Sequence, residues 1–124
     1  MNVVDSSGWL EFFSDGPNAS FFAPPIQKLS ELIVPTVSLY EVFKRVLQQR
    51  DETQALQAVA LMEQAMVVEL NAAIALSAAK LSGDLKLPMA DSIILASARA
   101  FDAMLWSQDA DFEGMEGIRF VRAL

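Results

Sequence analysis

Short apolar runs, each bounded by polar or turn-forming residues, recur along the chain. Five of them have the length and composition of β-strands that are buried on both faces. They comprise residues 3–4, 32–34, 66–68, 104–106 and 118–121. The pattern therefore predicts a central sheet of about five strands.

Between these runs, apolar residues recur at the spacing of amphipathic helices. The helical segments are residues 7–13, 26–32, 38–49, 52–64, 71–81 and 88–101. Pro24 and Pro25 are expected to bend the chain in the second helical region, because proline lacks a backbone N–H and restricts the residue before it to extended geometry.

Strand and helix alternate through most of the chain, with two helices in several of the connections. Parallel neighbouring strands need long, right-handed connections of this kind, and the connecting helices then cover both faces of the sheet. We expect an α/β fold, a three-layer α/β/α sandwich with a mostly parallel sheet. A chain of 124 residues forms this as a single domain, residues 1–124.

The chain contains neither histidine nor cysteine. These absences exclude hydrolases of the Ser-His-Asp and Cys-His types, histidine-based ribonucleases, and zinc sites made of histidine or cysteine. Acid, base or metal chemistry must therefore use other groups, chiefly the sixteen Asp and Glu residues. Carboxylate oxygens prefer hard cations such as Mg²⁺ or Mn²⁺.

Four acidic residues stand where a predicted strand leads into a helix or turn. Each has a structural explanation by itself. Asp5 is a candidate helix cap, Glu41 fits a capping box with Ser38, Asp91 lies in the first turn of a helix, and Asp109 suits a turn. Taken singly, these explanations are the better ones.

The joint position of the four acids favours a different interpretation. In a parallel sheet, the junctions that follow the strands share one edge, where ligands bind. A cap does not need charge, whereas neighbouring carboxylates raise one another's pKa unless a cation neutralises them. The pattern therefore predicts a site for one or two Mg²⁺ or Mn²⁺ ions.

Four sequence segments together resemble the PIN-domain nucleases, and in particular the VapC-type toxins of toxin–antitoxin pairs. The resemblance covers essentially the whole chain. It rests on Val-Val-Asp-Ser-Ser at residues 3–7 with Trp-Leu at 9–10, Val-Pro at 34–35 leading to Glu-Val at 41–42, Ala-Asp-Ser-Ile-Ile-Leu-Ala at 90–96, and Leu-Trp-Ser-Gln-Asp-Ala-Asp-Phe at 105–112.

The resemblance implies a Mg²⁺- or Mn²⁺-dependent endoribonuclease that hydrolyses RNA phosphodiester bonds with metal-activated water. Metal ligation falls to Asp5, Asp91 and Asp109, while Glu41 binds metal or positions water. Asp111 is a weaker candidate for the fourth carboxylate, because it follows Asp109 by two residues. Two hydroxyls are candidates to support these ligands, those of Ser6 and Ser107.

A net charge of −7 is unusual for a protein that binds RNA, since phosphate contacts normally use Lys and Arg. Bound cations would offset part of this charge. Lys44 and Arg45 follow Glu41 by about one helical turn, and Lys86 precedes the helix of Asp91. These three are weak candidates for phosphate contact, since exposed lysine usually faces solvent.

Toxins of this family are held by small antitoxin proteins whose tails cover a hydrophobic groove, and residues 26–61 are the candidate segment for it. A mean hydropathy of +0.32 also suggests a buried interface, in a homodimer or with the antitoxin. No predicted helix reaches the roughly 20 apolar residues that span a bilayer, and no basic segment precedes Asp5. We expect a cytoplasmic protein without a membrane role.

Three alternatives remain. A haloacid-dehalogenase-like phosphatase would use Asp5 as nucleophile but needs a second Asp where Ser7 stands. A receiver domain needs clustered acids after the first strand, and this chain has Asp5 alone. The third alternative is a catalytically inactive PIN-fold module that acts only through protein contacts.

Overall fold

The computed structural model describes all 124 residues and contains one five-stranded sheet. The strand order is β3-β2-β1-β4-β5, and every neighbouring pair is parallel. The predicted α/β fold with about five strands is therefore confirmed. The strands are β1 (Asn2–Val4), β2 (Leu32–Pro35), β3 (Met66–Val68), β4 (Met104–Ser107) and β5 (Ile118–Phe120).

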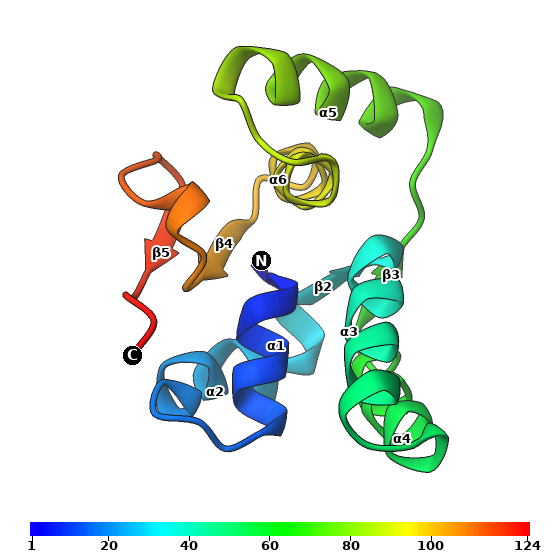
Figure 1. Ribbon diagram of the computed structural model, residues 1–124. Coiled ribbons are helices and arrows are strands. Elements are labelled where there is room, and N and C mark those ends of the chain that lie inside the picture. The colour runs from blue at the N-terminus through cyan, green and yellow to red at the C-terminus, as the bar shows by residue number, and fades with distance from the viewer.

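Helices cover both faces of the sheet and make the outer layers of the sandwich (Figure 1). The α-helices are α1 (Ser6–Phe13), α2 (Ala19–Gln27), α3 (Thr36–Gln49), α4 (Glu52–Met62), α5 (Ala72–Leu85) and α6 (Met89–Ala100). Two short 3₁₀ turns complete the chain, η1 (Leu29–Glu31) and η2 (Ala110–Phe112).

Adjacent residues of β1 divide the core between the two faces, because successive side chains of a strand point to opposite sides. Val4 packs with Trp9, Phe22 and Met62 under the layer of α1 to α4. Val3 packs with core residues of α6 on the other side, and α5 lies over α6. No helix is both long and apolar enough to cross a membrane.

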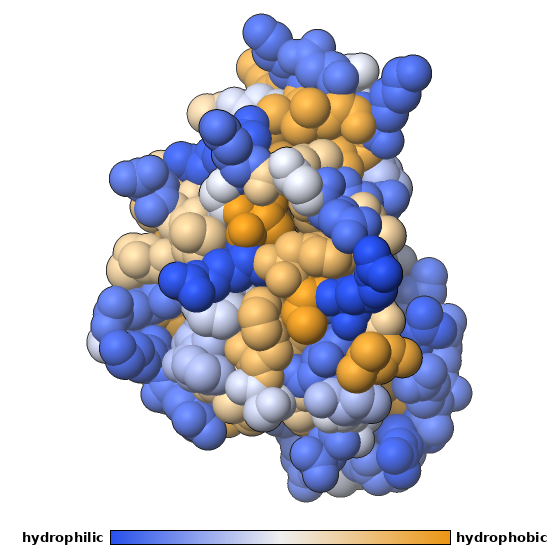
Figure 2. Space-filling model, turned by 90° about the vertical axis from the view of Figure 1, so that its left-hand side faces the viewer, coloured by the Kyte–Doolittle hydropathy of each residue, from blue (hydrophilic) through white to orange (hydrophobic).

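The β5 edge of the sheet is less well covered than its centre. Ile118 and Phe120 remain partly exposed. Figure 2 shows the left-hand side of the view in Figure 1, where β5 lies, with hydrophobic surface in the middle and hydrophilic side chains around it. β5, the last strand of the chain, forms this edge of the sheet, and β3 forms the opposite edge.

The prediction for the second helical region was wrong. Helix α2 continues through Pro24 and Pro25 and ends at Gln27. Both prolines lie near its end, and the helix stops two residues after them. Residues 29–31 form η1, and Leu32 is fully buried in strand β2 instead of ending a helix.

Candidate metal centre

Asp5 lies at the end of β1 and caps helix α1. Its Oδ1 accepts hydrogen bonds from the Gly8 backbone N–H at 2.9 Å and from the Ser7 hydroxyl at 2.7 Å. Its Oδ2 accepts a 2.5 Å hydrogen bond from the hydroxyl of Ser107, at the end of β4. Only 2% of Asp5 is exposed. The carboxylate therefore ties the ends of two adjacent strands together.

Burial makes the charged form of Asp5 costly. It raises the pKa of this carboxyl from 3.8 to about 6, although the hydrogen bonds from Ser107, Ser7 and Gly8 favour the charged form. The negative charge of Asp109 adds to the increase. The raised pKa therefore shows that burial outweighs the hydrogen bonds, which by themselves would lower it.

Three further carboxylates meet close to Asp5. Asp91 lies in the first turn of α6, while Asp109 and Asp111 belong to the turn that follows β4. One oxygen from each of these three residues lies within 4.8 Å of the others. The Asp109 side chain caps η2 by accepting from the Asp111 N–H at 3.0 Å, and its own backbone N–H donates to Ser107 at 2.9 Å.

The pKa of Asp91 is raised further than that of Asp5, from 3.8 to about 8. Burial contributes most, followed by the negative charge of Asp109. A hydrogen bond with Asp111 also favours the protonated form. The cluster therefore keeps a proton at neutral pH unless a cation replaces it. Oxygen ligands in this arrangement fit Mg²⁺ or Mn²⁺.

Glu41 is connected to the same edge by Ser6. The Ser6 hydroxyl donates to Glu41 Oε1 at 2.6 Å, which orients this side chain of α3 toward the residue next to Asp5. Ser38 and Glu41 do not form the capping box that their spacing allows. Pro35 precedes the first turn of α3, and Ser38 is fully buried inside the helix with an unpartnered hydroxyl.

The three candidate phosphate contacts are spread over different surfaces. Lys44 lies over the ring of Tyr40, 5.8 Å from its centroid. Lys86 ends α5 in the left-handed conformation, with φ of 57°. Only Arg45 lines a cleft beside the acidic residues.

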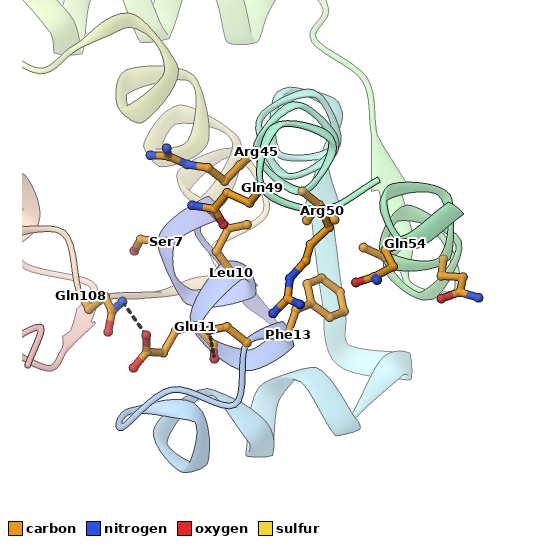
Figure 3. Close-up of a pocket in the computed structure, with 13 residues that line it drawn as sticks. Ser7, Leu10, Glu11, Phe13, Arg45, Gln49, Arg50, Gln54 and Gln108 are labelled. Atoms are coloured by element: carbon orange, nitrogen blue, oxygen red, sulfur yellow. Dashed lines mark hydrogen bonds between the residues drawn. The ribbon is translucent and has the colours of Figure 1, made fainter. Parts of the chain in front are cut away.

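This cleft lies between α1, α3 and α4 and has a volume of about 750 Å³ (Figure 3). Four of its thirteen lining residues are hydrophobic. Part of the segment 26–61 lines this cleft, and the exposed surface of the lining is divided about equally between polar and apolar atoms. Its polar and charged residues are Ser7, Glu11, Ser14, Arg45, Gln49, Arg50, Gln54, Gln57 and Gln108.

Sequence reasoning missed the residues that join this cleft to the acidic cluster. Gln108 stands between Ser107 and Asp109, and its amide oxygen accepts from Asn18 at 3.0 Å. The Gln108 amide also donates to Glu11 at 3.4 Å. Its place between two predicted site residues was the available signal.

The comparisons with known proteins agree with the fold. The PIN domain family matches residues 3–118, nearly the whole chain. The chain therefore belongs to the PIN-domain family, as its resemblance predicted. No curated protein sequence matches it significantly.

Solved structures show the same fold at low sequence identity. A toxin–antitoxin complex from Klebsiella pneumoniae is 21% identical with a TM-score of 0.78, and the match covers 96% of each chain. VapC20 of Mycobacterium tuberculosis, a toxin that cleaves the sarcin–ricin loop, is 16% identical with a TM-score of 0.78, covering 96% of this chain and 99% of that one. VapBC-1 from Haemophilus influenzae is 18% identical with a TM-score of 0.70, covering 98% and 96%.

Proposed function

We propose that this PIN-domain protein is a divalent-metal-dependent endoribonuclease, the toxin of a toxin–antitoxin pair. The observation that carries the proposal is the meeting of Asp91, Asp109 and Asp111 within 4.8 Å of one another, beside the buried Asp5. The choice of RNA as substrate rests on the family resemblance and on the cleavage described for the toxin from M. tuberculosis.

The residues of the site are proposed to have three roles: binding the cation, positioning water and holding the carboxylates in place. Asp5, Asp91 and Asp109 are the proposed ligands of Mg²⁺ or Mn²⁺, and Asp111 is close enough to join them. Glu41 binds the cation or orients water. A bound divalent cation acidifies water and offsets charge on the phosphodiester. Ser6 and Ser107 hold the carboxylates of Glu41 and Asp5 by donating hydrogen bonds.

Protonation links the site to its cation. At neutral pH the raised pKa of Asp91 keeps a proton on its carboxyl group. Deprotonation accompanies metal binding, because carboxylates bind metal in the charged form. Two divalent cations would reduce the formal net charge from −7 to about −3, which lessens the repulsion of RNA.

A protein partner is the second part of the proposal. Structures of similar fold include a toxin–antitoxin complex and VapBC complexes from several bacteria. Large hydrophobic side chains are exposed on this chain, among them Tyr40 at 63% and both Leu76 and Met89 at 74%. Antitoxin binding and homodimerisation are the proposed ways of covering part of this surface.

The proposal is tested with partner-free protein and labelled RNA. Wild type should cleave with Mg²⁺ or Mn²⁺ and stop with EDTA, whereas Asp5→Asn should lose cleavage by roughly 100-fold or more. Asp102→Asn is the matched control, because Asp102 is exposed in the turn before β4. This turn lies at the amino ends of the strands, whereas the candidate site lies at their carboxyl ends. Equal cleavage by wild type and Asp5→Asn would refute the site, and absence of cleavage by wild type would favour the inactive interaction module.

A further inference from the structure

Gln108 joins the end of strand β4 to the proposed metal ligand Asp109. Just before it, the Ser107 hydroxyl donates to Asp5 and accepts from the Asp109 backbone N–H. The backbone N–H and C=O of Gln108 take part in none of the backbone–backbone hydrogen bonds of the turns and loops. The hydrogen bonds that hold this residue therefore come from its side chain.

Both polar atoms of the Gln108 side chain are engaged. Its amide oxygen accepts from Asn18 Nδ2 at 3.0 Å, and its amide nitrogen donates to Glu11 Oε1 at 3.4 Å, the dashed line between the two residues in Figure 3. Glu11 Oε2 in turn accepts from the Asn18 backbone N–H at 2.7 Å. The three residues form a closed hydrogen-bond network, the Glu11–Asn18–Gln108 network.

Asn18 is the buried member of this network, with only 6% of its surface exposed. Its Nδ2 donates a second hydrogen bond, to the Arg122 carbonyl oxygen at 3.0 Å. One amide group therefore ties the loop between α1 and α2 to the turn after β4 and to the segment after β5. Because a buried amide needs partners for its hydrogens, the direction of each hydrogen bond in the network is defined.

The loop between α1 and α2 is shaped around the Glu11 carboxylate. A Cβ at Gly16 would lie 2.5 Å from Glu11 Oε1, so glycine leaves the space that the carboxylate occupies. The Gly16 backbone N–H also donates to the Glu11 carbonyl oxygen at 3.0 Å. The carboxylate is therefore held from two sides, by this loop and by Gln108.

We propose that Glu11 and Asn18 are positioning residues for the metal centre. They act through the Gln108 side chain, which holds the turn that presents Asp109 to the cation. This inference rests on the proposed function. Neither residue needs to touch the cation, because their contribution is to order the turn before the cation binds. Loss of such support typically weakens metal binding by about 10- to 100-fold.

The direction of the hydrogen bonds allows a test by substitutions of equal size. Asn18→Asp leaves Gln108 between two acceptors, and Glu11→Gln leaves it between two donors, so each single substitution costs the network one hydrogen bond. The double variant again offers Gln108 one donor and one acceptor, and the Gln108 amide matches both by rotating through half a turn. The double variant also keeps the net charge of the wild type.

Calorimetric titration of the full chain with Mn²⁺ at pH 7 measures the effect. Each single substitution should weaken Mn²⁺ binding by roughly 10-fold, and the double variant should recover most of that loss. Through charge alone, Asn18→Asp would strengthen the binding of a cation. A loss of affinity in this variant therefore separates positioning from a direct electrostatic effect.

Asn71→Asp is the matched control. It makes the same chemical change at the N-cap of α5, where the side-chain oxygen is the atom used, so its hydrogen bond from the Ile74 N–H is kept. Mn²⁺ affinity should stay unchanged in this variant. If the buried charge of Asn18→Asp prevents folding, Glu11→Gln decides the question, since Glu11 is partly exposed.

Amide hydrogen exchange of the metal-free protein reads the order of the turn without any cation. The Asp109 and Asp111 N–H groups donate to Ser107 Oγ and Asp109 Oδ1. Both should exchange about 5-fold faster in each single variant than in wild type or the control, because the turn opens more often.

Two results would overturn the positioning role: single variants with wild-type exchange and wild-type Mn²⁺ affinity, or a double variant that binds Mn²⁺ as weakly as the two losses combined. Wild-type protein that does not bind Mn²⁺ contradicts the proposed function and this inference with it. Normal Mn²⁺ binding by wild type and by both single variants contradicts only the positioning role.

Discussion

The Ser6 hydroxyl donates a 2.6 Å hydrogen bond to Glu41, a residue 35 positions later in the chain. This contact joins the start of α1 to α3, so it fixes the two helices that follow neighbouring strands β1 and β2. Since Asp5 precedes Ser6, the same short segment contains Asp5 and orients the side chain of Glu41. The site therefore depends on hydroxyl contacts as well as on its carboxylates.

Substituting Ser6→Ala should reduce cleavage by roughly 10-fold, because Glu41 loses the group that orients it. The protein should stay folded, as judged by thermal unfolding. Ser20→Ala is the control, since Ser20 is exposed near the start of α2. Single-turnover cleavage rates check the prediction, and equal rates for both variants would show that Glu41 needs no such support.

The stability of metal-free protein should decrease as pH rises from about 4 to 8. The pKa values of Asp5 and Asp91 are raised to about 6 and about 8, so the folded state holds more protons than the unfolded chain across this window. The stabilisation that these two protonated carboxyls add is fully present below the unfolded pKa near 3.8, and it is lost as pH rises through the folded values. Asp5 adds roughly 3 kcal/mol to the free energy of unfolding in this way.

Urea unfolding across this pH range, in EDTA and in Mg²⁺, measures the effect. Mg²⁺ should flatten the dependence, since the cation stabilises the charged carboxylates. A free energy of unfolding that rises with pH in EDTA would contradict the raised pKa values. The single substitution Asp91→Asn should make the free energy of unfolding less dependent on pH.

Asp109→Asn should reduce cleavage more than Asp111→Asn. The charge of Asp109 raises the pKa of Asp91 more strongly than that of Asp111 does, and Asp109 is the less exposed of the two. We expect losses of roughly 100-fold for Asp109 and roughly 10-fold for Asp111. Cleavage rates of the two variants, measured in parallel, check this order. A larger loss for Asp111→Asn than for Asp109→Asn would make Asp111 the principal ligand.

Gly8→Ala should destabilise the protein by about 1–3 kcal/mol through overpacking. A Cβ at Gly8 would lie 2.6 Å from both Phe22 Cε1 and Val4 Cγ1. The resulting shift of α1 would also disturb the Gly8 N–H that binds Asp5. Gly83→Ala is the matched control in helix α5, where the Cβ meets nothing within 4 Å.

That control should stabilise the protein by up to about 1 kcal/mol, because alanine favours helices more than glycine does. Thermal unfolding distinguishes the two variants. Equal stabilities would show that the junction of β1 and α1 can expand without cost.

The strands were predictable because each is a short apolar run buried on both faces, as Leu32, Ile33 and Val34 illustrate. Parallel pairing then placed Asp5 and Asp109 at the same edge of the sheet. Proline in α2 misled the prediction, since local preference opposed a helix that packs Phe22 and Ile26 into the core.

The site was less predictable than the sheet. The sequence leaves Asp109 and Asp111 as alternatives for the fourth carboxylate, whereas the η2 turn brings both toward Asp91. Ser38 and Glu41 matched a helix cap by spacing, and only tertiary structure shows Glu41 bound to Ser6. The cleft could not be predicted, because residues such as Arg50 and Gln108 line it from segments that are distant in sequence.

Calorimetric titration of partner-free protein with Mn²⁺ at pH 7 tests the central claim most directly. Running it in buffers of different ionisation enthalpy counts the protons released. Because Asp91 is protonated at this pH, wild type should bind Mn²⁺ and release about one proton per protein. Asp91→Asn should bind more weakly and release fewer protons. Absence of binding by wild type, or identical titrations for both proteins, would contradict a metal centre at these carboxylates.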